Sequence, residues 1–229
     1  MRGESRTMRM SVAAVAFLTL QACGGRGPAT PSPAAGSAES TVELEALYRA
    51  RADSALMSFT EADVRFMAGM IVHHTQALVM ARLAPTHGAS ASVQVLTART
   101  INAQQDEIAT MRDWLEARGQ SVPEIQISGT NIRVEGAPPA MGMMSGMLSE
   151  EQMRELDQAR GPDFDRLFLT YMIQHHAGAV EMVHELFATD GAALGDTVFK
   201  VASDIQVDQA TEIDRMQRML EALPTTGRR

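Results

Sequence analysis

Two adjacent histidines occur twice in the chain, each time between methionines at the same distances. Residues 70–80 read MIVHHTQALVM and residues 172–182 read MIQHHAGAVEM, so the two segments use four of the six histidines. Thioether sulfur is a soft ligand that favours Cu(I), and imidazole nitrogen accepts copper or zinc. The chemistry that these residue types suit is therefore the binding of a soft or borderline metal ion.

The candidate ligands are the histidine pair and two flanking methionines of each segment, namely Met70, His73, His74, Met80, Met172, His175, His176 and Met182. A structural role remains open, because buried histidines are often hydrogen-bonded to Gln or Glu. Methionines at helical spacing are also common core residues.

Both segments belong to an internal repeat. Asp63, Phe66 and Met70 recur at the same offset as Asp165, Phe168 and Met172, and QQDEIATM at 104–111 is followed later by QATEIDRM at 209–216. Within each block the apolar residues are spaced alternately by three and four, as in a helix seam. A duplication of this kind constrains the fold strongly.

The repeat predicts an all-α fold, an antiparallel four-helix bundle made of two tandem αα-hairpins related by an approximate two-fold axis. We expect its helices near 60–84, 90–118, 162–188 and 193–222, with Thr60 and Ser149 as helix starts. The expected domain covers 43–223 and comprises an extra helix at 43–58, repeat one at 60–118, a Met-rich crossover at 119–160 and repeat two at 161–223.

The N-terminal part is expected to be an export signal and a tether. Residues 1–22 carry a basic start and a short apolar run that ends in LQAC, which resembles a lipobox with Cys23 as the lipidated residue. An ordinary secretory signal with a chance cysteine is the alternative. Residues 23–42 are rich in Gly, Pro, Ala and Ser, a composition that does not support a packed core.

The segment MGMMSGM in the crossover holds a second candidate site, formed by Met141, Met143, Met144 and Met147. Exposed thioethers would suit Cu(I) or Ag(I). A Met-rich flap over the bundle is the alternative interpretation.

Polar residues of the later blocks are candidates for orienting the imidazoles, and they are Gln104, Glu107, Gln209 and Glu212. Because neighbouring helix residues differ by about 100° in direction, the two histidines of a pair face different partners. We expect His73 and His175 to be buried, and each imidazole to lie within hydrogen-bond or one-water reach of a Gln or Glu in the helix that follows it.

Composition excludes several classes of function. The net charge of −8 argues against a nucleic-acid partner. Cys23 is the only cysteine, so no intramolecular disulfide and no Cys-based zinc site can form. The sequence contains no recognisable nucleophile triad or phosphate loop.

The duplicated F-x3-M-I-x-H-H-x2-A-x2-M pattern and the trailing Q-x-x-E-I-x-x-M blocks resemble the family catalogued as domain of unknown function 305, over roughly residues 60–222. The resemblance implies a ferritin-like fold, and some members are periplasmic copper-binding proteins implicated in copper resistance. By motif it marks the eight His and Met residues of the two segments as site residues.

Three functions are consistent with the sequence. The first is a lipid-anchored cell-envelope protein that binds Cu(I) or Cu(II) for sequestration or transfer, located in the outer membrane and facing the periplasm if the organism is Gram-negative. The second is a ferritin-like di-metal oxidase, although only one Glu-x-x-His, Glu181 to His184, is present where such sites use two. The third is an envelope interaction module with structural histidines.

Overall fold

The computed structural model describes residues 36–56, 58–135 and 144–224. Cys23 and the crossover residues Met141 and Met143 lie outside this part of the chain. The elements, in chain order, are α1 (Gly36–Leu56), α2 (Glu61–Ala81), α3 (Ala91–Glu116), β1 (Ile125–Ser128), β2 (Asn131–Val134), α4 (Glu150–Gln158), α5 (Pro162–Phe187) and α6 (Asp196–Glu221).

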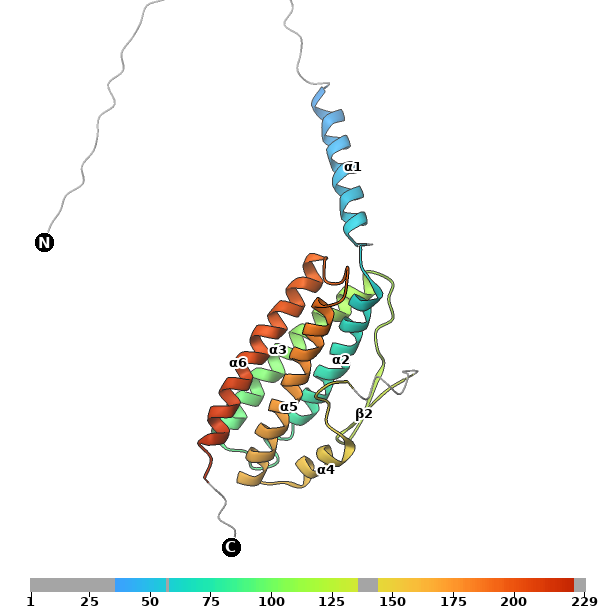
Figure 1. Ribbon diagram of the computed structural model, residues 1–229. Coiled ribbons are helices and arrows are strands. Elements are labelled where there is room, and N and C mark those ends of the chain that lie inside the picture. The colour runs from blue at the N-terminus through green and yellow to red at the C-terminus, as the bar shows by residue number, and fades with distance from the viewer. Residues whose placement is uncertain (1–35, 57, 136–143, 225–229) are drawn as a thin grey trace, which may run out of the picture. The chain divides into compact units, whose positions relative to one another are not determined.

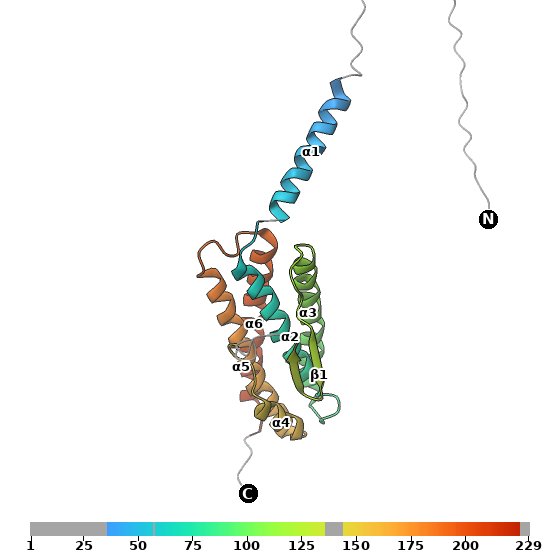
Figure 2. The same cartoon turned by 90° about the vertical axis from the view of Figure 1, so that its right-hand side faces the viewer.

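The helices α2, α3, α5 and α6 pack along one another as two hairpins, α2 with α3 and α5 with α6 (Figures 1 and 2). Contacts between α2 and α5 join the two hairpins, and α3 also touches α6. The expected all-α fold is confirmed. The predicted helix start at Thr60 is confirmed: Thr60 is the N-cap of α2, its side chain accepts from the Asp63 amide, and the Thr60 backbone amide donates to the Asp63 carboxylate.

Helix α1 begins at Gly36, inside the segment expected to be tether. Its sequence, GSAESTVELEALYRARADSAL, is rich in Ala, Glu and Leu, which favour the helix. Among the described residues, no helix combines the length and apolar character needed to span a membrane.

The crossover contains a pair of strands that the sequence analysis did not predict, and a short helix whose start it did predict. β1 and β2 form an antiparallel hairpin, in which Ser128 pairs with Asn131 and Gly129 turns the chain with φ +60°. Strands of four residues are too short to give a clear alternation. The short helix α4 starts at Ser149 with a full capping box to Gln152, so the predicted helix start is confirmed. β2 lies against α2, and α4 against α5.

One aspartate in each copy of the repeat accepts a hydrogen bond from a backbone amide of the other copy. The Asp63 carboxylate in α2 accepts from the Ala193 amide, 2.7 Å away in the loop before α6. Its counterpart Asp165 in α5 accepts from the Ser90 amide at 3.1 Å, where α3 begins. Each hairpin therefore fixes the turn of the other, as an approximate two-fold relation requires.

The core is divided along its length. One apolar cluster includes Phe66 and Met70 of α2 with Val183 of α5, and the other includes Ala77 of α2 with Phe168 of α5. Between the two clusters each of the four packed helices carries buried polar side chains: His73, His74 and Gln76 in α2, Thr97, Thr100 and Gln104 in α3, His175 and His176 in α5, and Gln209 in α6. We call this set the polar layer.

Candidate metal centre

The four histidines of the repeat lie in the polar layer and are completely buried, each with 0% relative exposure. The expected burial of His73 and His175 is confirmed. These two rings face each other across the contact between α2 and α5, with centroids 3.8 Å apart and planes inclined by 42°. Since the positions are equivalent in the two copies, the repeat brings one histidine against its own counterpart.

The other two histidines turn outward to the neighbouring helices. His74 Nε2 lies 2.8 Å from Glu107 Oε2 of α3, and His176 Nε2 lies 2.7 Å from Glu212 Oε2 of α6. A carboxylate can only accept, so Nε2 carries the proton in both rings and Nδ1 keeps its lone pair. Glu212 also accepts from the Thr100 hydroxyl at 3.1 Å.

Among the described residues, His73 and His175 make no direct hydrogen bond to a Gln or Glu of the following helix, so the direct bond expected for this pair is not formed. They face the α2–α5 contact instead of α3 and α6. His73 Nε2 donates to the Ser145 carbonyl oxygen at 3.0 Å, which leaves its Nδ1 with the lone pair. His175 has no partner at either nitrogen among the described residues.

Burial controls the protonation of this pair. Desolvation, with the neighbouring His74 as the next cause, lowers the pKa of His73 to about 3. Burial and then the neighbouring His73 lower the pKa of His175 well below 6.5. Both imidazoles are therefore neutral at pH 7, the form in which imidazole binds metal ions.

Seven buried polar atoms of the layer lack a hydrogen-bond partner among the described residues. They are Nδ1 of His73, His74 and His176, both ring nitrogens of His175, and Oε1 of Gln104 and Gln209. Buried polar groups are normally paired with protein or water, and unpaired ones call for a ligand, an ion or a water molecule. The layer is thus rich in nitrogen and oxygen atoms whose lone pairs could bind a metal ion.

The predicted methionines flank the imidazole pair on both sides. Met70 lies in one apolar cluster and the half-buried Met182 packs against it, whereas Met80 and Met172 lie in the other cluster. Met70, Met80 and Met172 have no exposed surface. These methionines therefore belong to the apolar clusters on either side of the polar layer.

Residues 144–148 of the crossover cover the α2–α5 contact, and we call them the strap. Besides the bond from His73 to Ser145, the buried Gln76 amide donates to the Leu148 carbonyl at 3.0 Å and accepts from the Leu148 amide at 2.8 Å. On α5 the strap rests directly on Gly178, where a Cβ would lie 2.0 Å from the Ser145 carbonyl oxygen.

The strap also brings together two methionines that the sequence analysis assigned to different sites. A Cβ on Gly69 would lie 3.2 Å from Met144 Sδ and 3.5 Å from Met182 Cε. Met144 and Met182 line a surface cavity of about 380 Å³ with Gly69 and Ser145. Met147, the other described member of the crossover cluster, is half-buried in the strap.

The sequence analysis missed Ser145, Gln76 and Gly178, which position the strap. The repeat held one signal for them, because Gly178 occupies the position of Gln76 in an otherwise well-matched segment. Ser145 could not have been found, since its backbone carbonyl makes the contact.

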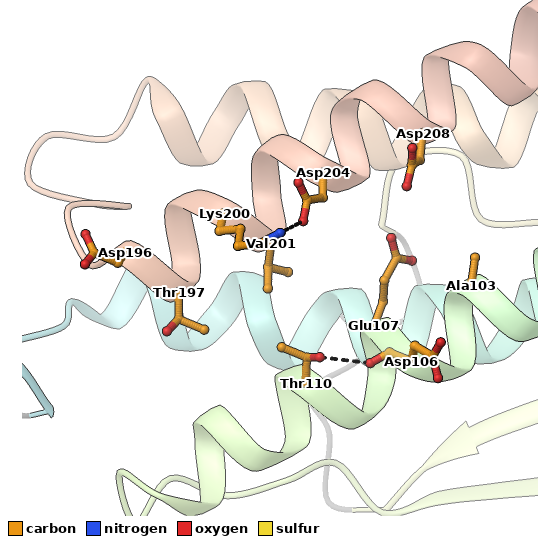
Figure 3. Close-up of a pocket in the computed structure, with 10 residues that line it drawn as sticks. All are labelled: Ala103, Asp106, Glu107, Thr110, Asp196, Thr197, Lys200, Val201, Asp204 and Asp208. Atoms are coloured by element: carbon orange, nitrogen blue, oxygen red, sulfur yellow. Dashed lines mark hydrogen bonds and ion pairs between the residues drawn. The ribbon is translucent and has the colours of Figure 1, made fainter. Parts of the chain in front are cut away.

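Glu107 and Glu212, the carboxylates bonded to His74 and His176, line a cleft between α3 and α6, part of which is drawn in Figure 3. Glu107 points from α3 toward Asp208 on α6. Burial, followed by the negative charges of Glu107, Asp204 and Glu212, raises the pKa of Asp208. Glu181 and His184 lie elsewhere: Glu181 accepts from the Ser145 hydroxyl and His184 is bonded to Gln206, so they do not complete a di-metal carboxylate site.

As they stand, no three His, Cys, Asp or Glu side chains within the described ranges surround a point where a metal ion would fit. A metal ion in the layer would have to combine imidazole with thioether or amide donors, or require side chains to turn.

The fold and its site define a class: a duplicated helical hairpin with a buried imidazole layer at the contact between the copies. The family model for the domain of unknown function DUF305 matches residues 63–220. The chain belongs to the DUF305 family. No curated protein matches the sequence.

Solved structures share this fold. A DUF305 fragment from Deinococcus radiodurans is 29% identical with a TM-score of 0.60, over 72% of this chain and 99% of that one. CopM in its Cu(I)-bound form is 25% identical with a TM-score of 0.51, and in its Cu(II)-bound form 26% identical with a TM-score of 0.53. Both CopM comparisons cover 69% of this chain and 95% of that one.

Proposed function

We propose that this protein is a lipid-anchored copper-binding protein of the cell envelope, which sequesters copper or passes it on. The observation that carries the proposal is the set of five imidazole nitrogens that are buried in the polar layer and have no hydrogen-bond partner in the described part of the chain. Neutral imidazole with a free lone pair is a good ligand for both copper ions. The likeness to CopM, whose structures contain Cu(I) or Cu(II), supports the same assignment.

His73 and His175 are the central ligands in this proposal, because their rings are in contact and both are neutral. His74 and His176 contribute through Nδ1, since Glu107 and Glu212 hold the proton at Nε2. The two glutamates thereby fix the tautomer and orientation of the rings. Gln104 and Gln209 belong to the same buried layer but are not copper ligands in this proposal.

The thioethers extend the site toward both apolar clusters and toward the surface. Met70, Met80 and Met172 offer sulfur atoms that favour Cu(I). Met144 and Met182 form a thioether pair in the surface cavity beside the strap, a suitable first position for a Cu(I) ion. Met141, Met143 and Met147 would add to this pair.

The envelope location rests on the N-terminal sequence. Residues 1–22 have the features of an export signal, and Cys23 is placed as the lipidated residue of a lipobox. We propose that a tether from Cys23 holds the helical domain at the membrane, on the periplasmic side of the outer membrane in a Gram-negative cell.

The test is a competition titration of the full-length protein against one Cu(I) chelator and one Cu(II) chelator. The decisive variant combines His73→Leu with His175→Leu, which replaces unpaired imidazoles by side chains of similar volume and is expected to fold. It should weaken Cu(II) binding by at least about a hundredfold, the effect of losing key ligands. His184→Ala, which removes an exposed histidine, is the matched control and should bind as the wild type does.

A second variant, Met144→Leu with Met182→Leu, should weaken Cu(I) binding and leave Cu(II) binding unchanged. If the wild-type protein binds neither ion more tightly than the His73→Leu/His175→Leu variant, the histidines are structural and the copper proposal fails. Palmitate labelling that persists in a Cys23→Ala variant would overturn the lipid anchor alone.

A further inference from the structure

The cleft between α3 and α6 is lined by carboxylates and amides that are not copper ligands in the proposal above. Two adjoining cavities of about 430 and 280 Å³ share Ala103, Glu107 and Asp208 in their linings, so they form one continuous cleft. Its carboxylates are Asp106, Glu107, Asp196, Asp204, Asp208 and Glu212. Among the described lining residues, the basic side chains are Arg99, Lys200 and Arg215, and Lys200 is paired with Asp204.

Two buried amides open into this acidic cleft. Gln104 of α3 and Gln209 of α6 occupy equivalent positions of the repeat, are only 2% and 4% exposed, and both line the cleft. Their Oε1 atoms have no hydrogen-bond donor among the described residues. A buried acceptor without a donor costs free energy, so each amide oxygen calls for a cation or a water molecule in front of it.

We propose that this cleft binds a hydrated divalent cation that prefers oxygen ligands, such as Mn²⁺ or Mg²⁺, between Gln104 and Gln209. Such ions keep several of their water molecules and are held by one or two carboxylates. Waters of the hydration shell donate to the two amide oxygens, and Asp208 supplies the carboxylate at the mouth of the cleft.

The hydration shell follows from the geometry of the glutamates. Glu107 and Glu212 each already accept a bond from an imidazole, and among the described residues they do not form with Asp208 a group of three carboxylates that could hold a metal ion directly. They therefore act on the cation through water and through their charge. Amide and carboxylate oxygens are hard donors, so this site differs in preference from the imidazole and thioether donors of the copper proposal and does not depend on it.

The experiment is a Mn²⁺ titration of the metal-free full-length protein, with free Mn²⁺ measured by electron paramagnetic resonance and water-proton relaxation recorded in parallel. One saturable site is expected, with enhanced relaxation because the bound ion keeps water. Asp208→Asn should weaken binding about tenfold, the order expected for one full charge in a surface cleft. Asp214→Asn removes the same charge from an exposed position of α6 outside both cavities, and it should bind as the wild type does.

Gln104→Leu combined with Gln209→Leu removes both acceptors without changing charge and should abolish saturable binding. The His73→Leu/His175→Leu variant should retain it, which separates this site from the copper site. The proposal is overturned if Mn²⁺ shows no saturable binding, if Asp214→Asn weakens binding as much as Asp208→Asn does, or if the leucine variant binds normally. Should the leucine variant not fold, the two aspartate variants decide.

Discussion

The substitution Gly178→Ala tests whether the strap holds the imidazole pair in place. A Cβ at this position would lie 2.0 Å from the Ser145 carbonyl oxygen, 2.3 Å from the Ser145 carbonyl carbon and 2.5 Å from the Gly146 Cα. All three are backbone atoms, so no side chain can rotate away. The strap must move off α5, and the same Ser145 carbonyl is the acceptor for His73.

Three contributions determine the change in stability, the first favourable to the variant and the other two unfavourable. Alanine is the better helix former, which favours the variant by about 1 kcal/mol. Overpacking against the strap costs about 1–3 kcal/mol. Removing the acceptor leaves a buried imidazole N–H unpaired, which costs a further 1–3 kcal/mol or so. The net effect is a destabilisation of about 3 kcal/mol.

Gly69→Ala is the matched control. Gly69 is also a buried helical glycine under the strap, but its Cβ would meet Met144 Sδ at 3.2 Å, the end of a flexible side chain that can shift. This variant should be as stable as the wild type or more stable, by up to about 1 kcal/mol. Urea unfolding gives both free energies, and amide exchange at residues 144–148 reports whether the strap has lifted.

Equal stability of the two alanine variants would refute the account of the strap. So would normal exchange protection in the strap of the Gly178→Ala variant, because the backbone contact could then not be as close as the structure places it.

Two further predictions concern pH and the aspartates that bond between the two copies of the repeat. Burial lowers the pKa of His73 to about 3 and that of His175 well below 6.5, so below pH 6.5 the unfolded chain takes up protons that the folded protein does not. The free energy of unfolding should therefore be fully present above pH 6.5 and fall below it by roughly 3 kcal/mol per pH unit. Urea unfolding at several pH values measures this slope, which should be smaller in the His73→Leu/His175→Leu variant. Asp165→Asn should cost about 1 kcal/mol and speed amide exchange at Ser90, whereas Asp163→Asn in the same helical turn, with an exposed side chain, should do neither.

The helices and the burial of the histidines were predictable because they depend on local periodicity. A run such as Phe66, Met70, His73 and Ala77 defines one helix face, and the repeat confirms it independently. The crossover was less predictable, since its contacts are long-range. The bond from Gln76 to Leu148 and the support of Ser145 by Gly178 join residues far apart in the sequence, and nothing in MGMMSGM indicates where that segment lies.

The duplication also explains why two identical side chains meet in the core. A residue close to an approximate two-fold axis contacts its own counterpart, as His73 does with His175. A residue far from the axis instead contacts a different segment of the other copy, as Asp63 and Asp165 do. The pairing of imidazoles thus needs only one histidine at the right position of an ancestral hairpin.

The crossover occurs once in the chain, so it cannot obey this symmetry, and it makes the two copies chemically different. The strap accepts the bond from Nε2 of His73 and is bonded to Gln76. The second copy has Gly178 in place of Gln76, and neither nitrogen of His175 has a partner among the residues that the structure describes. His175 is therefore the imidazole with the greatest capacity to take a ligand, and His73 keeps only Nδ1. If copper binds in this layer, the single variant His175→Leu should impair it more than His73→Leu, although the two residues are equivalent in the sequence repeat; equal effects would mean that the strap opens when the metal enters.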